Sequence, residues 1–166
     1  MFPVLIVDDS RDDSSLAGRI LQQCKILNPV HSFNSGAGCL DFLRRHFEGE
    51  NAGSAEPCLI FLDLSMAPMN GIEALQAINK IQNASKSCVV MLSGHTDVKL
   101  IREGYQLGAR TFLLKPLKLE DVMDFLHSAH KIIRIEMTAD GYGLYWVEPS
   151  ASTHGKPATW TVSVRA

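Results

Sequence analysis

The sequence has little of what marks nucleic-acid-binding, membrane-bound or exported proteins. Its 16 basic and 18 acidic residues give a net charge of −2, which provides no overall attraction for nucleic acid or an anionic membrane. The opening MFPVLIVDD has no basic segment, and its apolar run meets two aspartates at once. Such a run is too short for a signal peptide or a membrane-spanning helix. We therefore expect a cytoplasmic protein with no direct binding to DNA or membrane.

Two common site signatures are also lacking. The four cysteines lie in apolar stretches without Cys-x-x-Cys spacing, and they are Cys24, Cys39, Cys58 and Cys88. This favours small buried side chains over zinc ligands or disulfides. The segment 8–13, DDSRDD, offers aspartates where a nucleotide-binding turn needs glycines, and aspartates repel phosphates. Redox, zinc and nucleotide-binding functions are disfavoured.

Short apolar runs alternate with stretches of helical periodicity along most of the chain. The runs 3–7, 30–33, 58–62, 88–92 and 111–114 indicate strands, and helices are predicted over 14–25, 36–47, 70–81, 97–107 and 119–136. Ser35 can cap the second helix, and Asn70 with Glu73 resembles a capping box on the third. Five such units predict an α/β fold with a parallel, doubly wound sheet in the flavodoxin-like order 2-1-3-4-5.

The chain continues past this unit with a different pattern. Residues 137–166 contain both tryptophans and two of the three tyrosines. Strict alternation predicts a strand over 159–165, and 143–147 is a weaker candidate. We therefore divide the chain into 1–136 and a β-rich extension, 137–166, which is a β-hairpin or the start of a further domain. Since an isolated hairpin is marginal in water, it should pack on the first unit, pair with a second copy or continue into that domain.

Polar residues follow the strands at their carboxyl ends, the edge where open α/β sheets bind ligands. Asp8 and Asp9 follow the first strand, Asp63 the third, Ser93 the fourth and Lys115 the fifth. The expected strand order makes the first and third strands neighbours, so three carboxylates share one crevice. Their mutual repulsion favours a bound cation, and hard oxygen ligands suit Mg²⁺ or Mn²⁺.

These groups together are suited to phosphoryl transfer. A carboxylate can attack a phosphoryl donor, and the charge on the transferred oxygens then needs counter-ligands. Mg²⁺, Lys115 and the Ser93 hydroxyl each supply one, while Gly94 leaves the approach open. A haloacid-dehalogenase-like phosphatase uses similar groups, but its two aspartates share one DxD after the first strand, and this chain has DD there.

Four segments carry a family resemblance: VDDS at 7–10, FLDLSMAPMNG at 61–71, MLSG at 91–94 and FLLKP at 112–116. They resemble the receiver domain of two-component response regulators, over about residues 3–136. The resemblance implies Asp63 as phosphoacceptor, and Asp8, Asp9, Asp63 and the Ser65 backbone carbonyl as ligands of Mg²⁺. It further implies that Ser93 supplies the switch hydroxyl, that Lys115 pairs with the phosphoryl group and that Phe112 is the aromatic switch residue. The peptide bond before Pro116 is expected to be cis.

The same resemblance implies the partners and the output. The phosphoryl donor would be a histidine kinase or phosphotransfer protein, and the chain would be a switch rather than a turnover enzyme. Output would pass to a downstream protein or to an output domain outside these residues. A homodimer would use the fourth helix and fifth strand, or the C-terminal extension. The main alternative is a pseudo-receiver that binds proteins without phosphorylation, and such a chain would have lost at least one site group.

Three features depart from the family pattern. Pro68 follows Ala67, one position later than is usual in the loop after Asp63. His95 occupies a position that tunes dephosphorylation in receivers, although an ordinary exposed loop histidine is the alternative. The polar stretch 48–56 is an insertion, similar to extensions in receivers that respond to bacteriophytochrome-like kinases.

Overall fold

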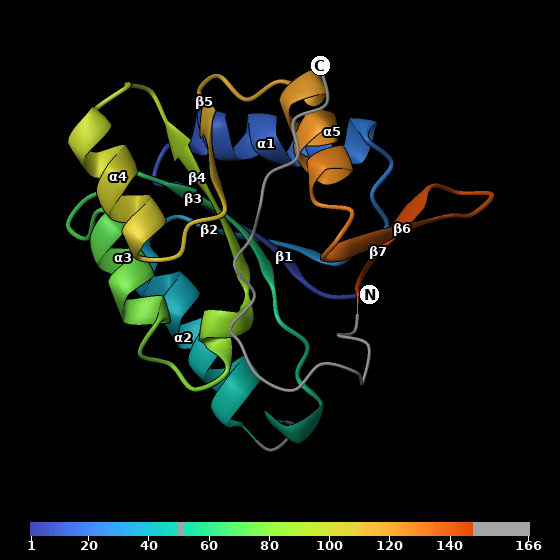
Figure 1. The fold of residues 1–166 in the computed structure, drawn as a ribbon, viewed down its shortest axis with the longest axis horizontal. Coiled ribbons are helices and arrows are strands. Elements are labelled where there is room, and N and C mark those ends of the chain that lie inside the picture. Colours follow the sequence, from blue (N-terminus) through green and yellow to red (C-terminus); the bar gives the residue numbers. More distant parts are fainter. Residues whose placement is uncertain (50–51, 148–166) are drawn as a thin grey trace.

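Five parallel strands form the central sheet of the structure, a computed structural model that describes residues 1–49 and 52–147. The strand order is β2-β1-β3-β4-β5, which confirms the predicted order 2-1-3-4-5 (Figure 1). The strands are β1 (Val4–Val7), β2 (Val30–Phe33), β3 (Leu59–Asp63), β4 (Cys88–Ser93) and β5 (Thr111–Leu114).

Helices cover both faces of this sheet. They are α1 (Arg11–Gln23), α2 (Gly36–Glu48), α3 (Gly71–Ile78), α4 (Val98–Gln106) and α5 (Leu119–Ser128), with single 3₁₀ turns η1 (Ala52–Ser54) and η2 (Ala84–Lys86). Figure 1 shows α1 and α5 on one face and α2, α3 and α4 on the other. The predicted caps are confirmed: the Ser35 hydroxyl accepts a hydrogen bond from the Gly38 N–H, and Asn70 and Glu73 form both bonds of a capping box.

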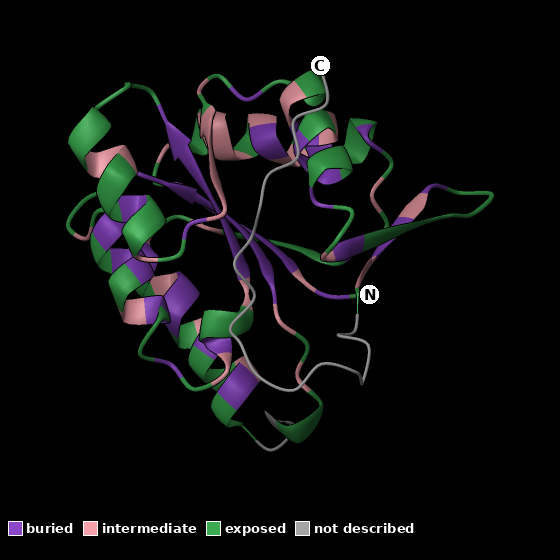
Figure 2. Ribbon diagram, viewed as in Figure 1, coloured by how far each residue is buried: buried purple, intermediate pink, exposed green. Residues whose placement is uncertain are grey.

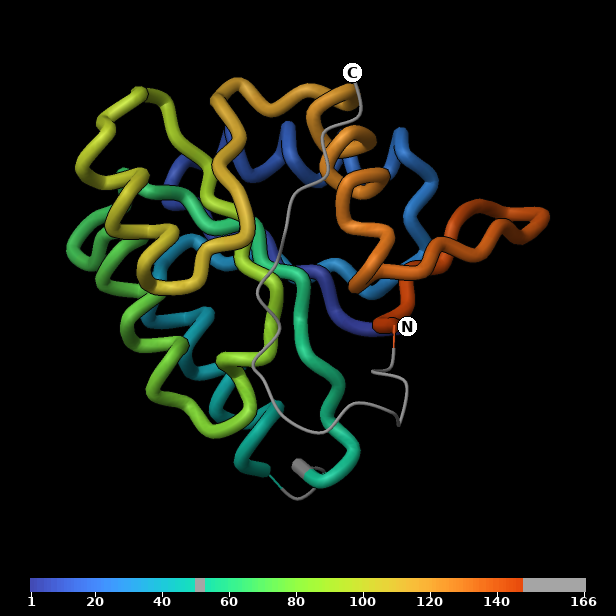
Figure 3. The backbone as a smooth tube through the Cα atoms, in the orientation of Figure 1, coloured from blue at the N-terminus to red at the C-terminus, as the bar shows by residue number. Residues whose placement is uncertain are grey.

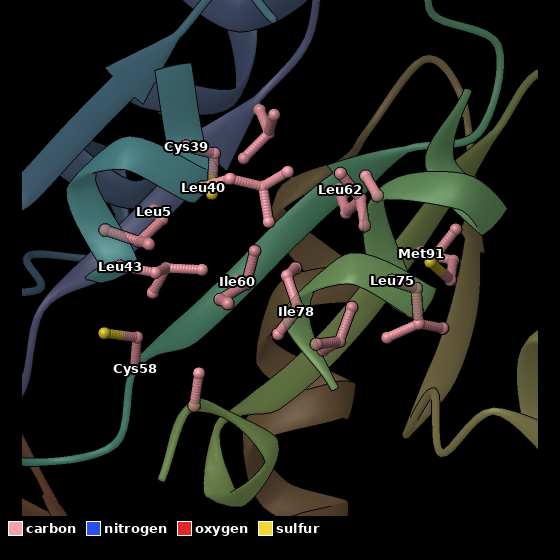
Figure 4. Packing of buried hydrophobic residues seen from close by; sticks show 14 of the residues in the cluster. Leu5, Cys39, Leu40, Leu43, Cys58, Ile60, Leu62, Leu75, Ile78 and Met91 are labelled. Atoms are coloured by element: carbon pink, nitrogen blue, oxygen red, sulfur yellow. The ribbon is translucent and has the colours of Figure 1, made fainter. Parts of the chain in front are cut away.

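The apolar side chains of the strands divide into two buried clusters, one under each helical layer. The inner strands β1, β3 and β4 are buried and the outer helix surfaces exposed (Figure 2). Figure 4 shows the cluster beneath α2 and α3, where Cys39 and Cys58 pack among leucine and isoleucine side chains. All four cysteines are buried and free. Burial raises the pKa of Cys39, Cys58 and Cys88 to about 12, so these thiols are unreactive at neutral pH.

The predicted helix over 119–136 is wrong in its second half. α5 ends at Ser128, whose hydroxyl donates to the Phe125 carbonyl, and β6 (Ile133–Met137) follows. β6 pairs antiparallel with β7 (Tyr142–Trp146). From Ile133 to Met137 apolar and charged residues alternate, which is a strand pattern, and this segment pairs with β7. The predicted strand over 159–165 lies outside the described residues, and the proposed division at residue 136 falls within β6.

The β6–β7 hairpin packs against the amino ends of the central strands, opposite the edge with the conspicuous polar residues. Leu144 is buried in the same apolar cluster as β1 and α5. The Trp146 ring stacks on Phe2 with centroids 4.3 Å apart, and its Nε1–H donates to the Pro57 carbonyl at 2.7 Å. The chain's N-terminus lies beside the base of the hairpin, and the hairpin turn projects away from the body (Figure 3).

One buried side chain joins the hairpin to the sheet. Asn28 accepts from the Leu144 N–H at 2.7 Å and donates to the carbonyls of Phe2 at 2.8 Å and Leu144 at 2.9 Å. The C-terminal extension is thus part of one packed body through residue 147. Over the described ranges, no helix is both long and apolar enough to span a bilayer.

Candidate functional site

The carboxyl edge of the sheet brings together the acidic residues predicted from sequence. β1 and β3 pair in parallel with Val7 opposite Leu62, so Asp8 and Asp63 lie side by side just beyond that pair. One oxygen each of Asp8, Asp9 and Asp63 lies within 4.8 Å of the others. Asp8 and Asp63 are each 2% exposed, whereas Asp9 is exposed. The cluster is therefore a buried carboxylate pair with a third carboxylate facing solvent.

Lys115 reaches into this cluster from the end of β5. Its Nζ lies 2.7 Å from Asp8 Oδ2 and 2.9 Å from Asp63 Oδ1. The Lys115 N–H donates to the Ser93 carbonyl at 2.9 Å, which extends the β4–β5 pairing to the base of the lysine. The peptide bond from Lys115 to Pro116 is cis. One ammonium thus neutralises part of the charge on two buried carboxylates.

Backbone groups hold the carboxylates in place. Asp8 Oδ1 accepts from the Ser10 N–H at 2.9 Å, and Asp9 Oδ2 accepts from the Ala67 N–H at 3.1 Å. The second bond ties the loop after β3 to the loop after β1. Gly71 allows the close approach of α3: a Cβ there would lie 2.4 Å from the Asp63 carbonyl oxygen. Any larger residue at position 71 would displace the backbone that carries Asp63.

The electrostatics of the site show that the Asp8 carboxylate is incompletely compensated. Burial raises the pKa of Asp8, and the Lys115 ammonium and the Ser10 N–H offset only part of that effect. Burial alone would lower the pKa of Lys115, but the nearby carboxylates of Asp8, Asp63 and Asp13 raise it above its usual value. Lys115 is therefore charged at any physiological pH, and the buried Asp8 carboxylate still favours further positive charge nearby.

The residues present fit a hard divalent cation. Asp8 Oδ2 and Asp63 Oδ1 are fully buried and, despite the nearby ammonium, accept no hydrogen bond of ordinary geometry from the described residues. Carboxylate oxygens are the ligands that Mg²⁺ and Mn²⁺ prefer. Ser65, whose carbonyl is the predicted fourth ligand, lies exposed in the loop two residues after Asp63. The unsatisfied oxygens and the acidic donor set therefore suit the predicted metal.

Ser93 ends β4 next to this cluster. The side chain is 2% exposed, and its hydroxyl donates to the His95 carbonyl and accepts from the His95 N–H. In this structure the hydroxyl is thus engaged by its own loop. Gly94 and His95 are exposed and line a shallow groove with Lys115. A Cβ at Gly94 would meet open space, so the approach over this residue is unobstructed.

Phe112 lies on β5, two strands from Asp63, and packs beneath α4. Its ring centroid is 5.2 Å from that of Tyr105, and the side chain is partly buried. A Cβ at Gly104 would lie 2.5 Å from Phe112 Cζ, so the ring rests directly on the helix backbone. The position of this ring and the position of α4 are therefore coupled by direct contact.

Sequence reasoning missed two features of the site. Asp13, in the first turn of α1, places Oδ2 3.1 Å from Lys115 Nζ. Its only signal is the acidic run 8–13, whose aspartates were interpreted as repelling phosphates. The second feature is a cis peptide bond between Ala67 and Pro68, in the loop that contacts Asp9. The unusual position of Pro68 marks this loop, but not its isomer.

Comparison with known proteins agrees with the fold and the site. Residues 4–127 match the family model of the response regulator receiver domain. This match covers most of the chain, and the chain belongs to that family.

Among curated relatives, the two-component response regulator ARR6 of Arabidopsis thaliana is 32% identical over 139 residues, covering 81% of this chain and 73% of the relative. The probable methanogenesis regulatory protein FilR2 of Methanothrix harundinacea is 28% identical over 121 residues, covering 73% and 76%. Both relatives are described as regulators, and both align over most of their length.

Solved structures give the same result. The bacteriophytochrome response regulator AtBRR superimposes with a TM-score of 0.65 at 26% identity, covering 76% of this chain and 91% of that one. The Mn²⁺-bound form of the response regulator Rcp1, from Synechocystis, gives a TM-score of 0.61 at 26% identity, covering 79% and 93%. The receiver fold and its place in two-component signalling are therefore established for this chain.

Proposed function

We propose that Asp63 accepts a phosphoryl group and that the resulting charge switches the surface formed by α4 and β5. The observation that carries this proposal is the Lys115 ammonium, 2.7 Å from Asp8 and 2.9 Å from Asp63, between two buried carboxylates with unsatisfied oxygens. A purely structural strand end has no need for such an arrangement. Functional sites are where incompletely compensated buried charge is expected.

The proposed donor is a phosphohistidine of a histidine kinase or phosphotransfer protein. A carboxylate oxygen of Asp63 attacks phosphorus in line, a new O–P bond forms and the N–P bond to the donor imidazole breaks. Lys115 compensates charge on the transferred oxygens, and the groove beside Gly94 and His95 admits the donor. The likeness to AtBRR supports, more narrowly, a bacteriophytochrome-like kinase as the source.

Asp8, Asp9, Asp63 and the Ser65 carbonyl would hold Mg²⁺ or Mn²⁺ in this proposal. When bound, the cation supplies charge stabilisation for the phosphoryl oxygens. The acidic cluster and the Mn²⁺-bound form of Rcp1 support this assignment. The protein's own contribution is to hold two of these carboxylates buried and in fixed positions, because burial strengthens their interaction with any cation.

The switch would begin at Ser93. Phosphorylation adds about −1.5 to −2 units of charge and new acceptor oxygens, which compete with the His95 carbonyl for the Ser93 hydroxyl. Movement of this loop reaches α4 and hence Phe112, which touches Gly104 and Tyr105. Val98, Tyr105 and Leu114 are exposed on this face. They offer apolar contacts to a downstream protein, an output domain or a second copy of the chain.

His95 is proposed to tune the lifetime of the phosphoryl group. His95 lies on the exposed loop, its backbone contacts the Ser93 hydroxyl, and the residue lines the shallow groove. Water that hydrolyses the aspartyl phosphate must pass this groove, so a bulky side chain there slows its entry. The chain remains a phosphoacceptor in this account and not a turnover enzyme.

The experiment that tests this function is phosphorylation with a small donor. The full chain is incubated with acetyl phosphate and Mg²⁺ and run on a phosphate-affinity gel, beside Asp63→Asn and the matched surface control Asp41→Asn. Asp41 is exposed on α2 and pairs only locally with Arg44 at 3.2 Å. We expect a shifted band for wild type and Asp41→Asn, and complete loss for Asp63→Asn or with a chelator.

The same gel separates the proposal from its main alternative. A pseudo-receiver would show no shift in any lane, and an equal shift of Asp63→Asn would move the phosphoacceptor elsewhere. The presence of all five predicted site groups, Asp8, Asp9, Asp63, Ser93 and Lys115, supports the phosphorylated form of the protein.

A further inference from the structure

Within the described part of the chain, Asp13 is the one ion-pair partner of the Lys115 ammonium that lies outside the acidic cluster. It belongs to the first turn of α1, where the Ser10 hydroxyl accepts a hydrogen bond from the Asp13 N–H at 3.3 Å. Ser10 in turn donates its own N–H to Asp8 at 2.9 Å. The helix cap therefore fixes Asp13 relative to Asp8. Its carboxylate reaches Lys115 Nζ at 3.1 Å, across 102 residues of sequence.

Lys115 divides its ammonium among three carboxylates. An ammonium has three protons to donate, and Asp8, Asp63 and Asp13 lie at 2.7, 2.9 and 3.1 Å. Only the bond to Asp13 has the geometry of an ordinary hydrogen bond, because Asp8 Oδ2 and Asp63 Oδ1 accept none from the described residues. The lysine thus forms shorter ion pairs with Asp8 and Asp63 and a hydrogen bond with a carboxylate outside the acidic cluster.

The environment of Lys115 makes its bond to Asp13 important for the stability of the ammonium. A small cavity borders Asp8, Asp13 and Lys115, and its remaining walls are apolar: Leu16, Ala17, Leu92 and Leu117. The Lys115 side chain is only 16% exposed, whereas that of Asp13 is 40% exposed. The ammonium therefore depends on protein carboxylates for its solvation, whereas the Asp13 carboxylate is also open to water.

We propose that Asp13 is a positioning residue that keeps Lys115 anchored when a divalent cation occupies the acidic cluster. This inference rests on the proposed function. A cation held by Asp8 and Asp63 weakens the attraction of both carboxylates for Lys115 and repels the ammonium directly. Asp13 then supplies the compensating charge that keeps Lys115 in the crevice. Without Asp13, each bound cation leaves a buried, poorly compensated ammonium, and metal affinity falls.

The test is isothermal titration of the full chain with MgCl₂ at constant ionic strength. We expect Asp13→Asn to bind Mg²⁺ about three- to tenfold more weakly than wild type, the range typical of contacting charged groups. The matched control is Asp12→Asn, which removes the same charge from the same helix turn at a residue that forms no ion pair with Lys115. Asp12→Asn is expected to stay within about twofold of wild type.

A double-mutant cycle shows whether Asp13 acts through the lysine. In a Lys115→Gln background, Asp13→Asn is expected to change Mg²⁺ affinity by no more than Asp12→Asn does. An undiminished effect in that background, or equal weakening by Asp12→Asn, would overturn the proposal in favour of a general field effect. Asn is isosteric with Asp and the site is partly exposed, so the variant should fold, which circular dichroism verifies.

The result also separates this inference from the proposed function. If wild type binds no Mg²⁺, both fail together. If wild type binds Mg²⁺ and is phosphorylated on Asp63 but Asp13→Asn binds Mg²⁺ equally well, only the role of Asp13 fails. Asp13→Glu supplies a further check, because restoring the charge on a longer side chain should recover affinity beyond that of Asp13→Asn.

Discussion

The amino and carboxyl edges of the central sheet, where its strands begin and end, bury polar side chains to almost the same extent. They differ in how completely those side chains are hydrogen-bonded. At the amino edge, Asn28 is 4% exposed and satisfies its oxygen and nitrogen with three hydrogen bonds to Phe2 and Leu144. At the carboxyl edge, Asp8 and Asp63 are 2% exposed, and each keeps one buried oxygen that accepts no hydrogen bond from the described residues. The exposed fraction of these side chains does not distinguish the two edges, but the completeness of their hydrogen bonding does.

This difference in hydrogen bonding distinguishes polar groups with a structural role from polar groups with a functional role. Buried polar groups in folded proteins are nearly always paired, and unpaired ones mark a ligand, a metal or a catalytic role. The amino edge uses its polar groups to attach the β6–β7 hairpin. The carboxyl edge holds its buried oxygens through ion pairs with Lys115 alone among the described residues, and burial raises the pKa of Asp8.

The sharpest test at the amino edge is Asn28→Ala. The substitution leaves the Phe2 carbonyl and both backbone groups of Leu144 without their partner, and we expect a loss of about 3 kcal/mol in unfolding free energy. Urea denaturation followed by circular dichroism measures it. Mg²⁺ binding should be unchanged, since the edge is remote from the site.

The matched control for Asn28→Ala is Asn79→Ala. Asn79 also donates to a backbone carbonyl, that of Leu107 at 2.8 Å, but it does so at an exposed position. Its loss should therefore cost less than about 1 kcal/mol. Equal losses for the two variants would show that completing the amino edge is not a special source of stability.

Trp146→Phe is expected to have a smaller effect at the same edge. Phenylalanine preserves much of the stacking on Phe2 but loses the Nε1–H bond to the Pro57 carbonyl. We expect destabilisation of about 1 kcal/mol, read from the same denaturation curves. A neutral result would assign the attachment of the hairpin to Asn28 and apolar packing alone.

The smallest expected effect is a pH dependence at the carboxyl edge. Because burial raises the pKa of Asp8 above its usual 3.8, the folded state binds this proton more tightly than the unfolded state does. In metal-free buffer, ionising Asp8 therefore costs stability as the pH rises above 3.8 and through the folded-state pKa. Asp8→Asn, which cannot ionise, should gain stability relative to wild type over that interval.

Denaturation of both proteins at a series of pH values, with and without Mg²⁺, measures this dependence. Added Mg²⁺ should reduce it, because the cation compensates the ionised carboxylate. A stability difference that does not vary with pH would mean that Lys115 already compensates Asp8 fully, and that the two edges are more alike than their hydrogen bonds suggest.

Local patterns in the sequence were enough to predict the sheet and most of the site. Buried strands have long apolar runs, and a parallel sheet puts their ends on one edge, so the sequence alone predicts that Asp8, Asp63 and Lys115 lie together. It does not predict the contact of Asp13 with Lys115, because helix orientation and side-chain reach decide that contact. The apolar residues keep helical spacing as far as Ile133, which hides the strand alternation that begins there, and the pairing of Ile133 with Trp146 reveals the strand.

The contacts of Asn28 have a consequence for synthesis on the ribosome. Its hydrogen-bond partner Leu144 follows it by 116 residues, well past residue 127, where the family match ends. At about 5–20 residues per second, roughly ten seconds separate the synthesis of Asn28 from that of Leu144. The five-stranded unit can form only near the end of that interval, after β5 is made, and until Leu144 follows its amino edge stays open to water and chaperones. The hairpin, which is translated after the signalling domain itself, closes that edge.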